Sequence, residues 1–276
     1  MDMTGSKHKN NYPSHPSRIR IGGFWWIVFS LAAGLVLWEL IIWLANPPVF
    51  LLPPPGLVGR RFWEVASNGI LLRHIFYTLI EILAGMALGV SAASAIGYLL
   101  AKSPTVERLL SPYVVASQAI PIVAIAPLLV IWFGPGLISK ILICALIVFF
   151  PVLINTIVGL RGVPEDLHDL MRSLLATPQQ TFWLLEVPAA LPVFLGGLRV
   201  GATLAVIGAV VGEFVGADRG LGFLVNLARG QYDTALVFVA ILTLVILALS
   251  MYGIVALLER RLLAWQQRKE QDILQQ

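Results

Sequence analysis

The amino-acid sequence predicts an all-α polytopic membrane protein with six transmembrane helices. Its 276 residues are 58% hydrophobic and only 12% charged, whereas soluble domains average about 45–50% apolar and about 25% charged residues. The mean hydropathy of +0.85 agrees with this. The apolar residues form repeated runs of about 20, the length that a helix needs to cross about 30 Å of hydrocarbon. This composition excludes a soluble enzyme, a disordered protein and an ordinary nucleic-acid-binding protein.

The chain begins with a polar tail, residues 1–23, which is predicted to be disordered and cytoplasmic. The first apolar run follows at 24–45. It is too long for the apolar part of a signal peptide and lacks a small-x-small cleavage site, so it is predicted to be a retained helix. Its ends carry the tryptophans that are typical of a membrane interface, Trp25, Trp26 and Trp43.

Five more spans are predicted, and together with the first they form one domain over 24–258. They lie at about 74–101, 109–133, 137–160, 192–215 and 235–258. The span at 109–133 contains three prolines, which predict a kinked or broken helix: Pro112, Pro121 and Pro127. A polar and helix-forming tail, 259–276, follows the last span.

The distribution of basic residues predicts the orientation of these spans. Six spans place both termini on one side of the membrane. With the termini inside, the inner segments carry 13 Lys and Arg residues and the outer segments carry 6. Because inner loops are enriched in Lys and Arg, both termini are predicted to be cytoplasmic, and the polar segment 161–190 becomes a cytoplasmic loop.

The loop 161–190 contains the pattern of a short amphipathic helix at about 165–176. Pro164 precedes carboxylates that favour a helix N-terminus. Leucine and methionine side chains then recur at helical spacing and predict an apolar stripe: Leu167, Leu170, Met171, Leu174 and Leu175. A second helix is predicted at 178–187, opened by Pro178. The stripe either lies on membrane lipid or docks in a groove of a soluble partner.

The sequence contains no recognisable catalytic or metal-binding motif. It has no phosphate-binding loop of the Gly-x-x-x-x-Gly-Lys type and no His-Glu-x-x-His motif. Cys144 is the single cysteine and lies within an apolar run, so an intrachain disulfide is impossible. No catalytic residue, metal site or cofactor is therefore predicted, and the chain is predicted not to be an enzyme.

The loop resembles the EAA loop of ABC importer permeases. The family pattern is Glu-Ala-Ala, three residues, Gly, nine residues, Ile, one residue and Leu-Pro. In this chain, the matching positions are Asp169, Leu170 and Met171, then Leu175, then Leu185, Val187 and Pro188. The spacing matches throughout, but Asp replaces Glu, and Leu175 replaces the glycine that allows a tight turn. Pro178 is an alternative source of that bend.

The resemblance extends over about 24–258. Segments such as LLPPPGLVGRRFWEV, TLIEILAGMALG and VVGEFVGADRGLGFL are similar to the nitrate/sulfonate/taurine-type permeases, and look closest to permeases for riboflavin or the pyrimidine precursor of thiamine. The resemblance implies the type I ABC importer permease fold and a homodimer in the bacterial-type cell (inner) membrane. It also implies separate ATPase subunits docked on the loop and an extracytoplasmic substrate-binding protein.

Three polar residues within the spans are candidates for the substrate path: Glu81, Gln118 and Glu213. A charge at mid-membrane costs at least about 2.5–3.5 kcal/mol on insertion scales, so each such charge needs a reason. The alternatives for the two glutamates are a structural ion pair or a side chain that reaches the membrane interface. Two alternatives for the whole chain also remain at this stage: a permease for aliphatic sulfonate, taurine or nitrate, and an ion-coupled secondary transporter.

Overall fold

The computed structural model describes residues 22–103, 105–109, 112, 116 and 121–264. All regular elements in these residues are helical. The chain divides into two units, Met1–Pro48 and Val49–Gln276. The first contains α1, Gly22–Ala45, which is apolar apart from Ser30 and Glu39. Candidate span residues 109–120, including Gln118, are largely outside the described part of the chain.

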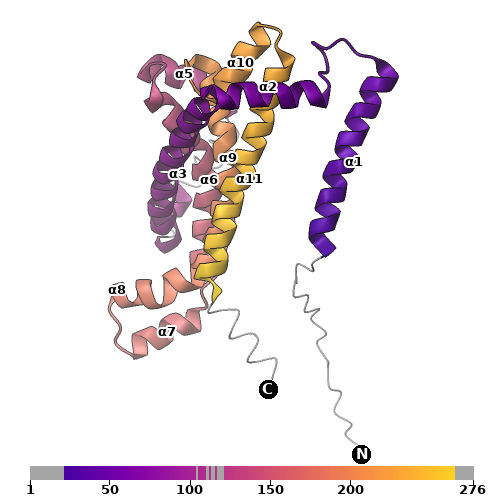
Figure 1. The fold of residues 1–276 in the computed structure, drawn as a ribbon. Helices are drawn as coiled ribbons and strands as arrows, with labels where there is room; N and C mark the ends of the chain where they lie inside the picture. The colour runs from indigo at the N-terminus through magenta and orange to yellow at the C-terminus, as the bar shows by residue number, and fades with distance from the viewer. Residues whose placement is uncertain (1–21, 104, 110–111, 113–115, 117–120, 265–276) are drawn as a thin grey trace, which may run out of the picture. The chain divides into compact units, whose positions relative to one another are not determined.

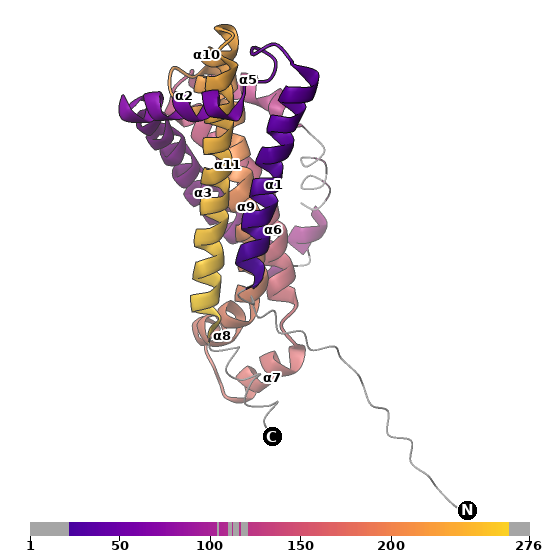
Figure 2. The ribbon, with the colours of Figure 1, turned by 45° about the vertical axis from the view of Figure 1, so that its right-hand side comes forward.

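The second unit is built around four long helices that run alongside one another (Figure 1). They are α3 (Ile70–Lys102), α6 (Leu137–Arg161), α9 (Val187–Gly216) and α11 (Thr234–Leu262). Shorter helices gather at one end of this bundle: α2 (Pro55–Ser67), α5 (Ile122–Phe133) and α10 (Leu221–Gly230). The opposite end carries α7 (Glu165–Ser173) and α8 (Pro178–Thr181), and Figure 2 shows the same separation from another side.

Five helices in the described residues are long and apolar enough to cross a membrane. They are Val28–Ala45, Ile70–Lys102, Leu137–Arg161, Pro178–Gly216 and Thr234–Leu262. The predicted span 109–133 is represented by α5, which has only 12 residues and starts after Pro121, whose backbone is extended. A proline directly before a helix costs no hydrogen bond within it, because the missing N–H is not needed at that position. The count of six spans stays a prediction.

Small residues allow α3, α6 and α9 to pack closely. Gly89 of α3 lies against Ala145 of α6, and a Cβ atom at Gly89 would come within 2.6 Å of the Ala145 carbonyl oxygen. Gly208 of α9 faces Cys144 of α6 in the same way, and a Cβ atom there would lie only 2.9 Å from the Cys144 Cα. Membrane helices associate through such close backbone approaches, since lipid tails are as apolar as the side chains. The core of the bundle therefore lies at the α3–α6–α9 contact.

The helix that ends in the bundle as α9 begins outside it, at α8. Residues Phe182–Glu186 form a π-helical turn that joins α8 to α9 without a break in the helix. Pro188 has no N–H to offer the Leu184 carbonyl, and its ring crowds that carbonyl. The wider π turn accommodates this loss. The expected separate helix at 178–187 is therefore replaced by a continuous helical segment, because the proline widens the helix here without ending it.

Candidate functional site

The predicted loop helix is present as α7, Glu165–Ser173, and is somewhat shorter than the predicted 165–176. Pro164 precedes it, Glu165 and Asp166 lie in its first turn, and Arg172 lies in its last turn. These charges complement the partial charges at the two helix ends. Asp169, the first position of the family pattern, is exposed and pairs with Arg172 at 2.8 Å. No residue of α7 is buried in the chain.

Apolar side chains of α7 and of the turn that follows it are largely exposed. Leu170 is 53% exposed, Leu174 is 68% exposed and Leu175 is 89% exposed, while Met171 is partly covered. Contiguous exposed apolar surface on one helix is typical of an interaction site. The predicted stripe is therefore present, and most of its side chains are exposed in the part of the chain that the structure describes.

The turn after α7 is made at Leu175. Its φ is +54°, in the left-handed region, and the Ala176 N–H donates to the Met171 carbonyl at 3.0 Å. This is the conformation that glycine adopts without strain. Leu175 thus keeps the turn of the family glycine although its side chain differs. The alternative, that Pro178 makes the bend, is wrong: Pro178 opens α8 instead.

The second half of the loop starts with a strong helix cap. The Thr177 side chain accepts from the Gln180 N–H, and the Gln180 side chain accepts from the Thr177 N–H at 2.8 Å. This reciprocal arrangement fixes the start of a helix. The remaining pattern positions follow in the π turn and at the start of α9, where all three side chains are partly buried: Leu185, Val187 and Pro188.

A buried carboxylate connects this loop with the bundle, and the sequence pattern did not identify it. Glu186 is 2% exposed. Its Oε1 atom pairs with Lys102 at the end of α3 and lies 3.4 Å from His168 Nε2 on α7. The only hint in the sequence is a charge next to apolar residues. Its partners could not be identified there because Lys102 is 84 residues away along the chain.

The opposite end of the bundle holds the two glutamates predicted for the substrate path. Glu81 of α3 and Glu213 of α9 are each 1% exposed. Lys140 of α6 lies 3.6 Å from Glu81, and Thr78 donates to Glu213 at 2.6 Å. Both carboxyl groups are thus enclosed by the chain in this conformation. Their role in a path stays a prediction, as does that of Gln118, which lies outside the described residues.

The Glu213 cluster also fixes the start of α10. The first N–H groups of a helix have no partner within it. Here the Gly220 N–H donates to His74 Nδ1 at 3.0 Å, the Leu221 N–H donates to Thr78 Oγ1 at 2.8 Å, and the Gly222 N–H donates to Glu213. Gly220 has a φ of +108° and its face lies against the Glu213 carboxyl group. The segment 216–222, which is Gly-rich, is therefore a structural connection between α9 and α10.

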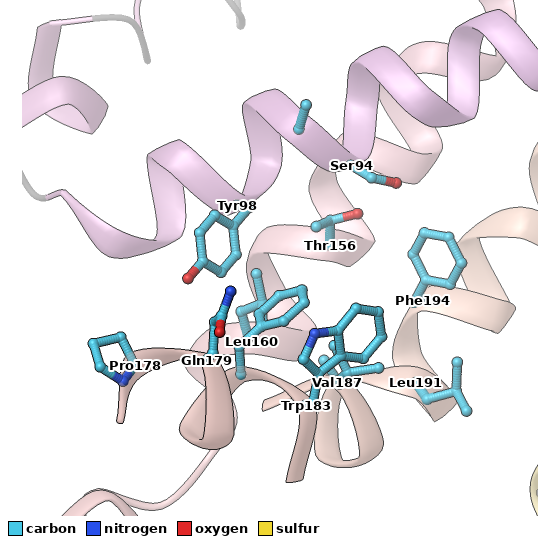
Figure 3. A pocket seen from close by; sticks show the side chains of 13 residues that line it. Ser94, Tyr98, Thr156, Leu160, Pro178, Gln179, Trp183, Val187, Leu191 and Phe194 are labelled. Atoms are coloured by element: carbon cyan, nitrogen blue, oxygen red, sulfur yellow. The ribbon is translucent and has the colours of Figure 1, made fainter. Parts of the chain in front are cut away.

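A pocket of about 770 Å³ lies beside the second half of the loop. Figure 3 shows Tyr98 of α3, Thr156 of α6, and Gln179 and Trp183 of the 178–187 segment around it. Phe194 of α9 closes another side. Most of its lining is apolar and aromatic, so a shift of the segment 178–187 would change the shape of this pocket.

The comparisons with known proteins agree with this geometry. Residues 85–264 match the family described as "Binding-protein-dependent transport system inner membrane component". The chain is 47% identical over 232 residues to a riboflavin transport system permease protein of Chloroflexus aurantiacus, covering 84% of this chain and 87% of that protein. It is 37% identical to a formylaminopyrimidine transport permease protein of Halalkalibacterium halodurans, covering 85% and 93%.

A more distant relative is named for the same class of protein, and a solved structure shares the fold. The chain is 32% identical to the taurine transport system permease protein of Escherichia coli, covering 86% of this chain and 88% of that protein. A chain of the inward-facing MetNI methionine ABC transporter matches the fold with a TM-score of 0.64 and 21% identity, covering 71% and 98%. The suspected family is thereby confirmed: the chain belongs to the binding-protein-dependent transport system inner membrane components, as a multi-pass permease subunit of an ABC importer.

Proposed function

We propose that this permease forms a homodimer of six-helix subunits with cytoplasmic termini, and that ATPase subunits dock on the segment 165–188. ATP-driven closure of the ATPases moves this segment, and the bundle then changes which side of the membrane its path is open to. A binding protein delivers the substrate from the other side. The permease itself carries out no covalent chemistry.

The observation that supports this proposal is the exposed apolar face of α7. An amphipathic helix that the chain leaves uncovered fits the groove of a soluble partner. The alternative is that the apolar face of α7 lies on lipid. Amphipathic helices that bind anionic lipid carry Lys and Arg on their polar face. The helix α7 instead carries three carboxylates, Glu165, Asp166 and Asp169, which agrees less well with lipid binding.

Replacing Leu170, Met171 and Leu174 together by Asp tests the docking role. We expect the ATPase to be lost from the purified complex while the permease still inserts into the membrane, because three carboxylates would replace the apolar contact. Arg108→Asp is the control, since it places a carboxylate at an exposed position outside the segment 165–188. Unchanged recovery of the ATPase with the triple variant would show that this face is not the docking surface.

For the substrate, we propose riboflavin or a pyrimidine precursor of thiamine. The 47% identical relative is named for riboflavin transport and the 37% identical relative for formylaminopyrimidine transport. Relatives at 33% and 32% identity are named for aliphatic sulfonates and taurine, which are therefore the alternative substrates, together with nitrate. In this proposal Glu81, Gln118 and Glu213 offer acceptors to the solute when the path is open.

To test the substrate proposal, the complex is purified in mild detergent from its own host and reconstituted into lipid vesicles. Uptake of each candidate substrate into these vesicles is then measured. We expect an ATPase and a binding protein to copurify. Riboflavin or the pyrimidine should then be taken up only with ATP, and the two compounds should compete if one path carries both. Uptake of taurine, an aliphatic sulfonate or nitrate in their place would refute the substrate. A permease that comes out alone even after crosslinking would refute the importer assembly.

A further inference from the structure

Glu186 lies where three parts of the molecule meet. It is the last residue of the π turn and directly precedes α9. Lys102 is the last residue of α3, and His168 lies on α7. The Glu186 carboxylate, next to the start of α9, thus contacts the end of α3 and the helix α7, which we call the docking helix.

The contacts of Glu186 are unequal on its two oxygens. Oε1 accepts from Lys102 Nζ and lies 3.4 Å from His168 Nε2. Oε2 is buried and has no hydrogen-bond partner in the described residues. The Lys102 side chain is 43% exposed and that of His168 is 24% exposed, against 3% for Glu186. Because the Glu186 carboxylate is buried, loss of the Lys102 ammonium would leave an uncompensated charge.

The docking helix has few other attachments to the bundle. No residue of α7 is buried, and the Asp169–Arg172 pair lies within α7 itself. The nearby Arg161 of α6 does not take part, because it pairs with Glu107 at 2.5 Å and donates to the Leu100 carbonyl at 3.1 Å. Among the described residues, the contact between His168 and Glu186 is therefore a direct polar link between α7 and the bundle, in addition to the chain connections at the two ends of α7.

We propose that Glu186 is a positioning residue that transfers the movement of α7 to α3 and α9 through His168 and Lys102. This inference rests on the proposed docking function of the segment 165–188. It assigns to Glu186 a role separate from docking: the ATPase binds α7, and Glu186 makes the bundle follow. The π turn next to Glu186 lets this end of α9 shift without breaking the helix.

His168→Ala is the decisive variant. It removes the contact between α7 and Glu186 but leaves the Lys102–Glu186 pair intact, so the bundle should fold normally. The reporter is a cysteine placed at Asp218 (D218C), an exposed site at the outer end of the bundle. The native Cys144 is buried and should not react with the label. The measured quantity is the change in the labelling rate of this cysteine by a maleimide when ATP and vanadate are added to the complex. Arg108→Met, an exposed cation on the cytoplasmic side, is the control.

We call the change in labelling rate on addition of ATP and vanadate the nucleotide response. In the His168→Ala complex we expect this response to fall at least about fivefold, which is the lower end of typical coupling between two sites. The ATPase should still copurify in wild-type amount. His168→Gln, which keeps a polar group, should recover part of it. A full response in His168→Ala would overturn the inference. So would loss of the ATPase from this variant, because His168 would then belong to the docking surface. Absence of the ATPase from the wild-type complex would instead refute the proposed function.

A pair of substitutions provides an independent check. Lys102→Met alone leaves the Glu186 carboxylate without its cation and should reduce both the response and the amount of folded protein. Adding Glu186→Gln removes the buried charge and should restore folding, but not the response. Recovery of the response in the double variant would show that the charged contact is dispensable and would overturn the inference.

Discussion

At the scale of single residues, the turn at Leu175 carries backbone strain. Its φ of +54° is unfavourable for a residue with a Cβ atom, and its side chain, 89% exposed, contributes little packing. The family pattern has glycine at this position. A leucine therefore occupies the turn at a cost that glycine would avoid.

Leu175→Gly should strengthen this turn. We expect the amide hydrogen of Ala176, which bonds the Met171 carbonyl, to exchange about two- to fivefold more slowly, because the left-handed conformation costs glycine about 1 kcal/mol less. Hydrogen exchange with mass spectrometry measures this. Leu174→Gly is the control: Leu174 has a φ of −82°, so the same change there should speed exchange. Faster exchange in both variants would contradict the strain argument.

By contrast, both carboxylate oxygens of Glu213 have hydrogen-bond donors in this conformation. Its two oxygens accept from Thr78 and from the Gly222 N–H. Glu213→Gln turns one acceptor into an NH₂ group that faces a donor, so we expect a loss of about 1–3 kcal/mol. The thermal midpoint of the detergent-purified protein should fall. Glu64→Gln, at an exposed pair on α2, should change it very little. Equal midpoints for the two variants would show that the Glu213 contacts are not stabilising.

At the scale of helices, close approach determines which substitutions the bundle tolerates. Gly89→Ala places a Cβ within 2.6 Å of the Ala145 carbonyl, and we expect it to destabilise the α3–α6 contact by about 1–3 kcal/mol. Gly253→Ala in α11 meets no atom within 4 Å and should stabilise its helix slightly, since alanine is the better helix former. Shifts of the thermal midpoint in opposite directions for the two variants would support this. An unchanged midpoint for Gly89→Ala would contradict it.

The sequence predicted the presence of these helices more accurately than the residues at which they begin and end. The spans at 137–160 and 235–258 correspond to α6, Leu137–Arg161, and α11, Thr234–Leu262. The span at 192–215 and the separate helix at 178–187 are in fact one helical segment, Pro178–Gly216. Local pattern identifies an apolar run, but the structure shows that a π turn next to Pro188 lets the helix continue through it.

At the scale of the whole molecule, the proposed assembly predicts a composition. Native mass spectrometry of the complex in mild detergent should give two permease chains and two ATPase subunits, because a path at a two-fold axis needs two copies of the bundle. The complex of the triple variant should lose the mass of the ATPase and keep the permease pair. This is the variant in which Leu170, Met171 and Leu174 are replaced by Asp. A single permease chain per complex would contradict the homodimer.

The sequence by itself determined the membrane class, the helical content and the amphipathic helix of the loop 161–190. Each follows from local properties: the length of apolar runs, the prolines and caps, and the spacing of the stripe from Leu170 to Leu174. Tertiary structure alone decided the partners of the buried charges. Glu213 meets Thr78 across 135 residues, and Glu186 meets Lys102 across 84. Such contacts depend on how the helices pack, since a buried charge is stable only where packing brings its partner.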